Sequence, residues 1–174
     1  EEKMGLKKRM MSLLLAAAVA VGSFLAAPVR AEAATTIAKG IDVSKYQGAV
    51  NWSAVKNAGY SFAFIKIGSA KSGLDPYYAA NMAGANAAGL KVGAYIYSYA
   101  TTVEAAITEA QFAIAALEPY TVSYPVVFDL EDSVHKNMTP EQLASLAVAF
   151  CSTVQSAGYY PMVYSSKNWM TGKI

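Results

Sequence analysis

Cysteine and histidine are nearly absent from this sequence. The single cysteine, Cys151, cannot form a disulfide within the chain, and the apolar helical pattern around it predicts a buried, unreactive thiol. The single histidine, His135, excludes a metal site built from several histidines, and its loop position predicts a solvated side chain. We therefore expect no metal and no other cofactor.

Net charge is also lacking once the first 34 residues are set aside. From Thr35 onward, nine lysines and no arginine are balanced by four Asp and five Glu. A neutral chain has no cationic field with which to attract a polyanion. This excludes nucleic acid as an expected partner.

Long apolar runs are missing except near the N-terminus. There a basic stretch from Lys3 to Arg9 precedes an apolar run that begins at Met11, and small residues offer cleavage sites after Ala31 or Ala33. This pattern predicts a secretion signal over residues 1–34. Because the run is short for a bilayer span of ~20 residues, we expect a secreted or cell-wall-associated protein without stable membrane insertion.

The remaining sequence alternates between strand and helix patterns. Apolar, β-prone runs predict strands at 37–43, 61–67, 92–99, 126–132 and 161–165, with helices between them at 51–58, 75–89, 101–117 and 139–158. Asp75 and Pro76 are predicted to start the second helix, and Thr101 with Glu104 a capping box for the third. A glycine follows three of these helices, which predicts C-caps that lead into strands.

Apolar strands separated by helices form a parallel sheet that helices cover. An open doubly wound sheet and a closed (β/α) TIM-like barrel both satisfy this α/β pattern. The barrel is favoured because polar residues end several predicted strands, at the positions where barrel enzymes assemble their active sites. These residues are Asp42, Ser98, Asp129, Glu131 and Ser165.

The stretch 126–132 is an apolar run that ends in carboxylates. In a strand, successive side chains alternate between faces, so Val127, Asp129 and Glu131 share one face. Two adjacent carboxylates repel when both are ionised, so one retains its proton to higher pH and the pair supplies an acid and a base. The apolar strand and the flanking acids favour the proton on Glu131. The structural alternative is a set of solvated loop acids or the first turn of a helix.

Several segments together resemble the family 25 glycoside hydrolases, N-acetylmuramidase lysozymes with a modified β/α barrel. They are Gly40–Gly48 (Gly-Ile-Asp-Val-Ser-Lys-Tyr-Gln-Gly), Asp75-Pro76, residues 88–95 and 97–100, the Asp129-Leu130-Glu131 triplet and residues 158–166. The resemblance spans residues 38–174. This sequence departs from the family in two places. Many members carry Lys-x-Ser/Thr-Glu-Gly after the second strand, whereas here Lys66-Ile67 is followed by Gly-Ser-Ala. The family also has an aspartate on a late strand, and this sequence has no counterpart of it.

The resemblance implies hydrolysis of the β-1,4 bond between N-acetylmuramic acid and N-acetylglucosamine in peptidoglycan glycan strands. It implies Glu131 as the general acid, with Asp42 and Asp129 as its carboxylate partners. The stereochemical outcome stays open, as does a substrate-assisted route in which Asp129 orients the N-acetyl group.

Aromatic residues provide candidate sugar contacts, because a tyrosine presents both an apolar ring face and a hydroxyl. We expect Tyr46, Tyr97 and Tyr99 to line a substrate groove, whereas packing is the simpler explanation for Tyr164, Trp52 and Trp169. Lys66, a charged residue in an apolar strand, either ends the strand in solvent or pairs with an acid.

Two other functions compete with a muramidase. Another glycan hydrolase such as a chitinase typically shows a longer Asp-rich run before its catalytic Glu, which Val126-Val127-Phe128 lacks. A non-catalytic wall-binding module would have lost turnover, and retention of all three acids argues against it.

The length bears on the domain organisation. An eight-stranded barrel takes at least ~200 residues, whereas residues 35–174 supply 140. We therefore expect a catalytic domain truncated to about five strands and incomplete at its C-terminus. Expressed alone, it should be poorly soluble and inactive, and the complete domain should be monomeric.

Overall fold

The computed structural model describes residues 38–167 and 169. The predicted secretion signal, residues 1–34, lies outside the described residues. Within the part that the structure describes, no helix combines the length and apolar character that a membrane crossing requires.

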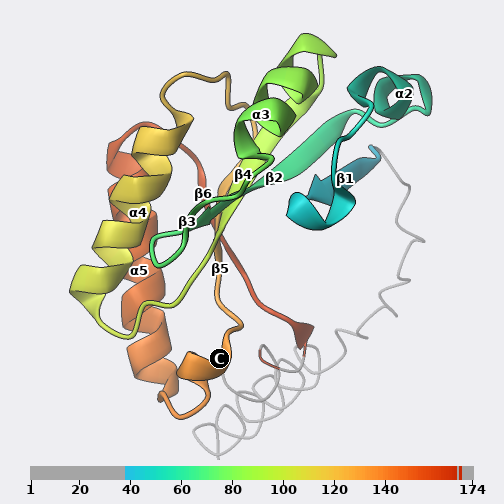
Figure 1. Cartoon of the computed structure of the whole chain (residues 1–174). Coiled ribbons are helices and arrows are strands. Elements are labelled where there is room, and N and C mark those ends of the chain that lie inside the picture. The colour runs from blue at the N-terminus through green and yellow to red at the C-terminus, as the bar shows by residue number, and fades with distance from the viewer. Residues whose placement is uncertain (1–37, 168, 170–174) are drawn as a thin grey trace, which may run out of the picture. The chain divides into compact units, whose positions relative to one another are not determined.

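Five parallel strands follow one another across a single sheet in chain order (Figure 1). They are β1 (Gly40–Val43), β2 (Phe62–Ser69), β4 (Lys91–Tyr97), β5 (Val126–Asp129) and β6 (Pro161–Tyr164). The short β3 (Gly73–Leu74) folds back antiparallel onto the end of β2. A doubly wound sheet reverses its strand order at a switch point. The unbroken order found here is that of a barrel wall, which resolves the alternative left open by the sequence pattern.

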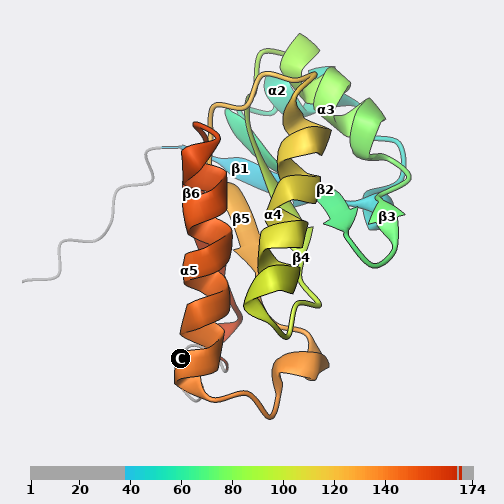
Figure 2. The same ribbon diagram turned by 90° about the vertical axis from the view of Figure 1, so that its left-hand side faces the viewer.

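The connections between the parallel strands are helical. They contain α2 (Trp52–Asn57), α3 (Tyr78–Ala87), α4 (Val103–Leu117) and α5 (Pro140–Ser156), with 3-10 turns η1 (Lys45–Gln47) and η2 (Ser133–His135). Figure 2 shows α3, α4 and α5 side by side over one face of the sheet. The predicted C-caps are confirmed, since Gly59, Gly89 and Gly158 follow three of these helices with φ of 85°, 69° and 87°.

Alternate residues of the strands divide the sheet into two unlike faces. The helix-covered face forms the core and includes Ile65, Ile96, Val126 and Phe128, all fully buried. The ring of Phe128 stacks on Phe150 of α5 with centroids 4.4 Å apart, and burying a phenylalanine contributes about 1.5–3 kcal/mol. The helices α3, α4 and α5 leave the opposite face uncovered, and Tyr95 and Asp129 lie on it.

Several predicted element boundaries were wrong, among them the starts of α3 and α4 and the end of β5. Helix α3 begins at Tyr78 because the Asp75 carboxylate instead accepts hydrogen bonds from the backbone N–H groups of Lys45 and Tyr77, each at 2.9 Å. Helix α4 is capped by Thr102, whose hydroxyl accepts from the N–H of Ala105 at 3.2 Å, rather than by Thr101. Strand β5 ends at Asp129, three residues earlier than predicted.

The prediction for His135 was also wrong, because its side chain is fully buried. Its Nε2 lies 2.9 Å from the carbonyl oxygen of Ala100, and its ring lies edge-on to Trp169 at 6.4 Å. Trp52 and Trp169 both pack against the core, as expected. Cys151 is half-buried, and burial raises the pKa of its thiol.

Candidate active site

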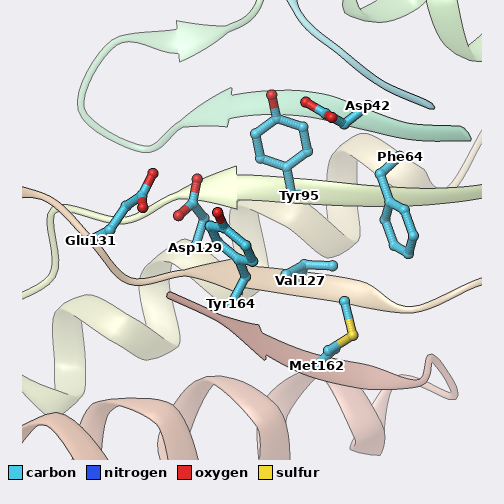
Figure 3. Close-up of a pocket in the computed structure, with 8 residues that line it drawn as sticks. All are labelled: Asp42, Phe64, Tyr95, Val127, Asp129, Glu131, Met162 and Tyr164. Atoms are coloured by element: carbon cyan, nitrogen blue, oxygen red, sulfur yellow. The ribbon is translucent and has the colours of Figure 1, made fainter. Parts of the chain in front are cut away.

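A pocket of about 330 Å³ opens on the face of the sheet that α3, α4 and α5 leave uncovered. Strands β1, β2, β4, β5 and β6 all contribute to it, and Figure 3 shows the carboxylates of Asp42, Asp129 and Glu131 directed into the same space. The remaining lining residues are Phe64, Tyr95, Val127, Met162 and Tyr164. The structure thus brings together the three acids that the sequence singled out. The volume is within the range of small-molecule sites.

The turn after β1 is fixed by side-chain hydrogen bonds, which positions the strand that bears Asp42. Ser44 and Gln47 form a capping box: the side-chain oxygen of Gln47 accepts from the Ser44 N–H at 2.8 Å, and the Ser44 hydroxyl accepts from the Tyr46 N–H at 3.3 Å. Asp75 adds its bond to the N–H of Lys45. The Asp42 side chain itself is exposed at the pocket mouth.

The chain around Asp129 is held by its neighbours on both sides. The N–H of Ser98 donates to the carbonyl of Asp129 at 3.0 Å, and the N–H of Leu130 donates to the carbonyl of Tyr164 at 2.8 Å. The buried Ser165 hydroxyl donates to the carbonyl of Leu130, also at 2.8 Å. Strand-like alternation therefore continues past β5, and Glu131 lies on the same side as Asp129 (Figure 3). Ser98 and Ser165 have structural roles behind the pocket.

Asp129 is the acid whose ionisation the pocket disfavours. Burial, together with the charge of Glu131, raises the pKa of Asp129 to about 7, and the charge of Lys66 opposes this shift. Its side chain is 6% exposed, and its Oδ1 has no hydrogen-bond partner among the described residues. Near neutral pH Asp129 is therefore protonated in a large fraction of the molecules, whereas the sequence pattern had placed the retained proton on Glu131.

Tyrosine hydroxyls surround the acids. Burial and the charges of Asp42 and Asp129 raise the pKa of Tyr95, and Figure 3 shows its hydroxyl beside the Asp42 carboxylate. The charge of Glu131, followed by burial, raises the pKa of Tyr164 across the pocket. Both phenols therefore remain neutral hydrogen-bond donors over the physiological pH range.

The tyrosines predicted to bind substrate lie in a different place. Tyr46, Tyr97 and Tyr99 line a second pocket of about 300 Å³, and Tyr97 donates to Asp132 at 3.1 Å. The sequence reasoning attributed Tyr164 to packing, although this residue is half-exposed and lines the carboxylate pocket, and it missed Tyr95. Its two-residue spacing from Tyr97 places both side chains on the same face of β4, which could have identified it.

This chain resembles known proteins in both its sequence and its fold. The family model for glycosyl hydrolases family 25 matches residues 41–174. Lysozyme M1 of Streptomyces globisporus is 46% identical over 64 residues, which are 37% of this chain and 22% of that protein. The modular autolysin LytC of Streptococcus pneumoniae superposes with a TM-score of 0.68 at 25% identity, over 77% of this chain and 33% of LytC.

A family 25 glycosyl hydrolase from Bacillus anthracis has the same fold, with a TM-score of 0.69 at 24% identity over 81% of this chain and 67% of that one. The chain spans about half the length of other curated relatives that it matches. The matched residues include the three acids of the pocket and, except for Gly40 at the start of β1, all five parallel strands. The chain belongs to family 25 of the glycosyl hydrolases.

Proposed function

We propose that this protein is a muramidase that hydrolyses the β-1,4 bond between N-acetylmuramic acid and N-acetylglucosamine in peptidoglycan. The observation that carries the proposal is that Asp42, Asp129 and Glu131 line one pocket, in which burial and the charge of Glu131 raise the pKa of Asp129. Glycoside hydrolysis requires one protonated carboxyl and one carboxylate at the scissile bond. LytC, with which this chain shares its fold, has been solved with a synthetic peptidoglycan ligand.

We assign Glu131 as the general acid that protonates the leaving glycosidic oxygen. In the free pocket, burial favours the proton on Asp129. A bound sugar removes water from the half-buried Glu131, and positive charge that develops on the sugar ring favours an ionised Asp129. Both effects favour a proton on Glu131 and a charge on Asp129 once the sugar is bound, so that Glu131 gives its proton to the leaving oxygen as the bond breaks.

Asp42 and Asp129 are the carboxylate partners of this acid. They face the ring that acquires oxocarbenium-like charge, and their own negative charge stabilises it. Either Asp129 orients the N-acetyl group of the substrate to attack, or a carboxylate acts directly. The anomeric configuration of the first product, followed by NMR, separates a retaining from an inverting reaction.

We further propose that residues 1–34 direct secretion and that the protein acts as a monomer on the cell wall. The basic, apolar and small-residue segments of the leader support secretion. Cleavage of the leader, read by N-terminal sequencing of the secreted protein, tests this part of the proposal.

The test of the catalytic proposal is Glu131→Gln in the full-length protein, measured by clearing of Gram-positive cell walls and by reducing-end analysis of the fragments. The amide retains the shape of the side chain but cannot transfer the proton, so lysis should be lost while the fold is kept. The matched control, Glu118→Gln, alters an exposed glutamate at the end of α4 and should lyse like the wild type.

The products separate this proposal from its rivals. A muramidase leaves N-acetylmuramic acid at the new reducing ends. Cleavage of chitin in preference to walls would indicate a chitinase, and wall binding without any new reducing ends would indicate a non-catalytic module. Near wild-type lysis by Glu131→Gln would refute the assignment of the acid.

A further inference from the structure

The second pocket continues the first along the same face of the sheet. Phe64 and Tyr95 line the carboxylate pocket, and the next residues on that face of the same two strands, Lys66 and Tyr97, line the second. The β2–β3 hairpin, visible beside the end of β2 in Figure 2, closes its outer side. A glycan bound at the acids would therefore extend a substituent into this second pocket.

Three ammonium groups are directed at the tyrosines of the second pocket. The Nζ of Lys45 lies 5.4 Å from the ring centroid of Tyr46, and the Nζ of Lys71 lies 4.7 Å from that of Tyr99. Lys66 lies between the pockets, with its Nζ 4.9 Å from the centroid of Tyr97. We call this site the lysine–tyrosine pocket.

Its positive charge is only partly neutralised from within. Asp75 is the carboxylate that lines the pocket, and its two oxygens accept backbone N–H groups of Lys45 and Tyr77. No ion pair involves Lys45, Lys66 or Lys71 within the described part of the chain. Each ammonium instead covers a tyrosine face, which makes that face unavailable to a sugar ring. An anion is thus the ligand that this pocket best complements.

The two pockets therefore have opposite charge and should accept different parts of one substrate. The carboxylate pocket would repel an anionic substituent and admit a neutral sugar ring. In peptidoglycan the muramic acid residues carry peptide stems with free carboxylates. We propose that the lysine–tyrosine pocket binds the stem carboxylates of the muramoyl residue next to the scissile bond, so that the enzyme prefers glycan strands that bear stems. This inference rests on the proposed muramidase function.

Removing the charge on each side of this contact tests the proposal in the full-length protein. One substrate is a glycan strand bearing peptide stems, with phosphodiester-linked polymers removed by hydrofluoric acid. A second is the same strand after its stem carboxylates have been amidated. A third retains the phosphodiester-linked polymer, because a phosphate on the same sugar is the other source of negative charge.

The variant is Lys45→Gln/Lys71→Gln, which leaves Lys66 beside Asp129 intact. Its matched control is Lys39→Gln/Lys91→Gln. These exposed lysines lie at the N-terminal ends of β1 and β4, whereas the pockets lie toward the C-terminal ends. Lys91 also covers a tyrosine, since its Nζ lies 5.7 Å from the ring centroid of Tyr124.

For the wild type, amidation of the stems should raise KM about 3- to 10-fold, as expected for two exposed charge contacts. In Lys45→Gln/Lys71→Gln, KM should already be raised on the charged strands and should rise no further on amidation. The control variant should behave like the wild type on both substrates.

The outcomes separate this inference from the function on which it rests. Absence of muramoyl reducing ends with every substrate would refute the muramidase itself. Lysis with equal KM on charged and amidated strands would overturn only the stem-binding inference. An effect of the lysine variant confined to strands that retain the phosphodiester-linked polymer would overturn the stem as ligand and identify the phosphate.

Discussion

Replacing Asp129 with asparagine should make the protein more stable above neutral pH, although it removes a carboxylate from the proposed catalytic pocket. The folded pKa of Asp129 is about 7, against an ordinary value of 3.8. The folded protein therefore binds this proton more tightly than the unfolded chain does. The associated stability is fully present below about pH 4 and is lost as the pH rises through 7.

The magnitude follows from the shift. About three pH units at about 1.4 kcal/mol each correspond to ~4 kcal/mol of unfolding free energy. The pocket is open to water and Glu131 is half-exposed, so screening reduces this figure to roughly 2–3 kcal/mol. Asparagine is neutral at every pH and does not incur this cost.

Urea unfolding of the full-length protein near pH 5 and near pH 8.5 measures the effect. The Asn variant should exceed the wild type by about 1 kcal/mol near pH 5, where Asp129 of the unfolded chain is already ionised, and by roughly 2–3 kcal/mol near pH 8.5. Glu118→Gln, remote from the pocket, should keep the same difference from the wild type at both values. A difference between Asp129→Asn and the wild type that did not change with pH would refute the reasoning.

Three further predictions concern activity and packing. Wall lysis should show a bell-shaped pH profile with its optimum on the acid side of neutrality, and a flat rate between about pH 5 and pH 9 would contradict catalysis by a pair of carboxyls. Asp42→Asn should slow lysis at least ~10-fold with an unchanged circular dichroism spectrum. Gly93→Ala should lower the thermal stability by about 1–3 kcal/mol, because its Cβ would lie 2.5 Å from the Phe64 ring and 2.8 Å from the Pro125 carbonyl oxygen. Phe64→Leu in the same chain should recover part of that loss.

The parts of the fold that depend on short-range patterns could be predicted from the sequence. Glycines after the helices located the helix ends, and the two-residue period of the β5 stretch placed Val127, Asp129 and Glu131 on one face. All three line the pocket. Asp42 joins them because the ends of parallel strands meet at one edge of a sheet, which requires only the strand assignment.

Features that depend on contacts between distant segments could not be predicted. His135 follows β5 in what reads as a loop, and it is buried because Ala100 and Trp169 enclose it. The cap of α4 is Thr102 rather than the adjacent Thr101, since the preceding backbone is fixed by Glu109, which accepts from the N–H of Tyr99 at 2.9 Å. Two neighbouring threonines are indistinguishable to a local rule.

The lysine–tyrosine pocket is a third feature of this kind. Lys66 and Tyr97 are far apart in the sequence and meet only because β2 pairs with β4. From Thr35 onward the sequence has no net charge, so composition gave no sign of a local excess of lysine.

The alternation of side chains along β5 limits how the gene can change in length. Val126, Phe128 and Leu130 lie in the core, whereas their immediate neighbours Val127, Asp129 and Glu131 line the pocket. Loss or gain of a single codon in this stretch would exchange the two sets, which would bury carboxylates against α5 and expose Phe128. Selection should therefore remove such insertions and deletions. Codons added to the loops that follow the strands leave this alternation intact, so new substrate preferences can arise there while the strands keep their length.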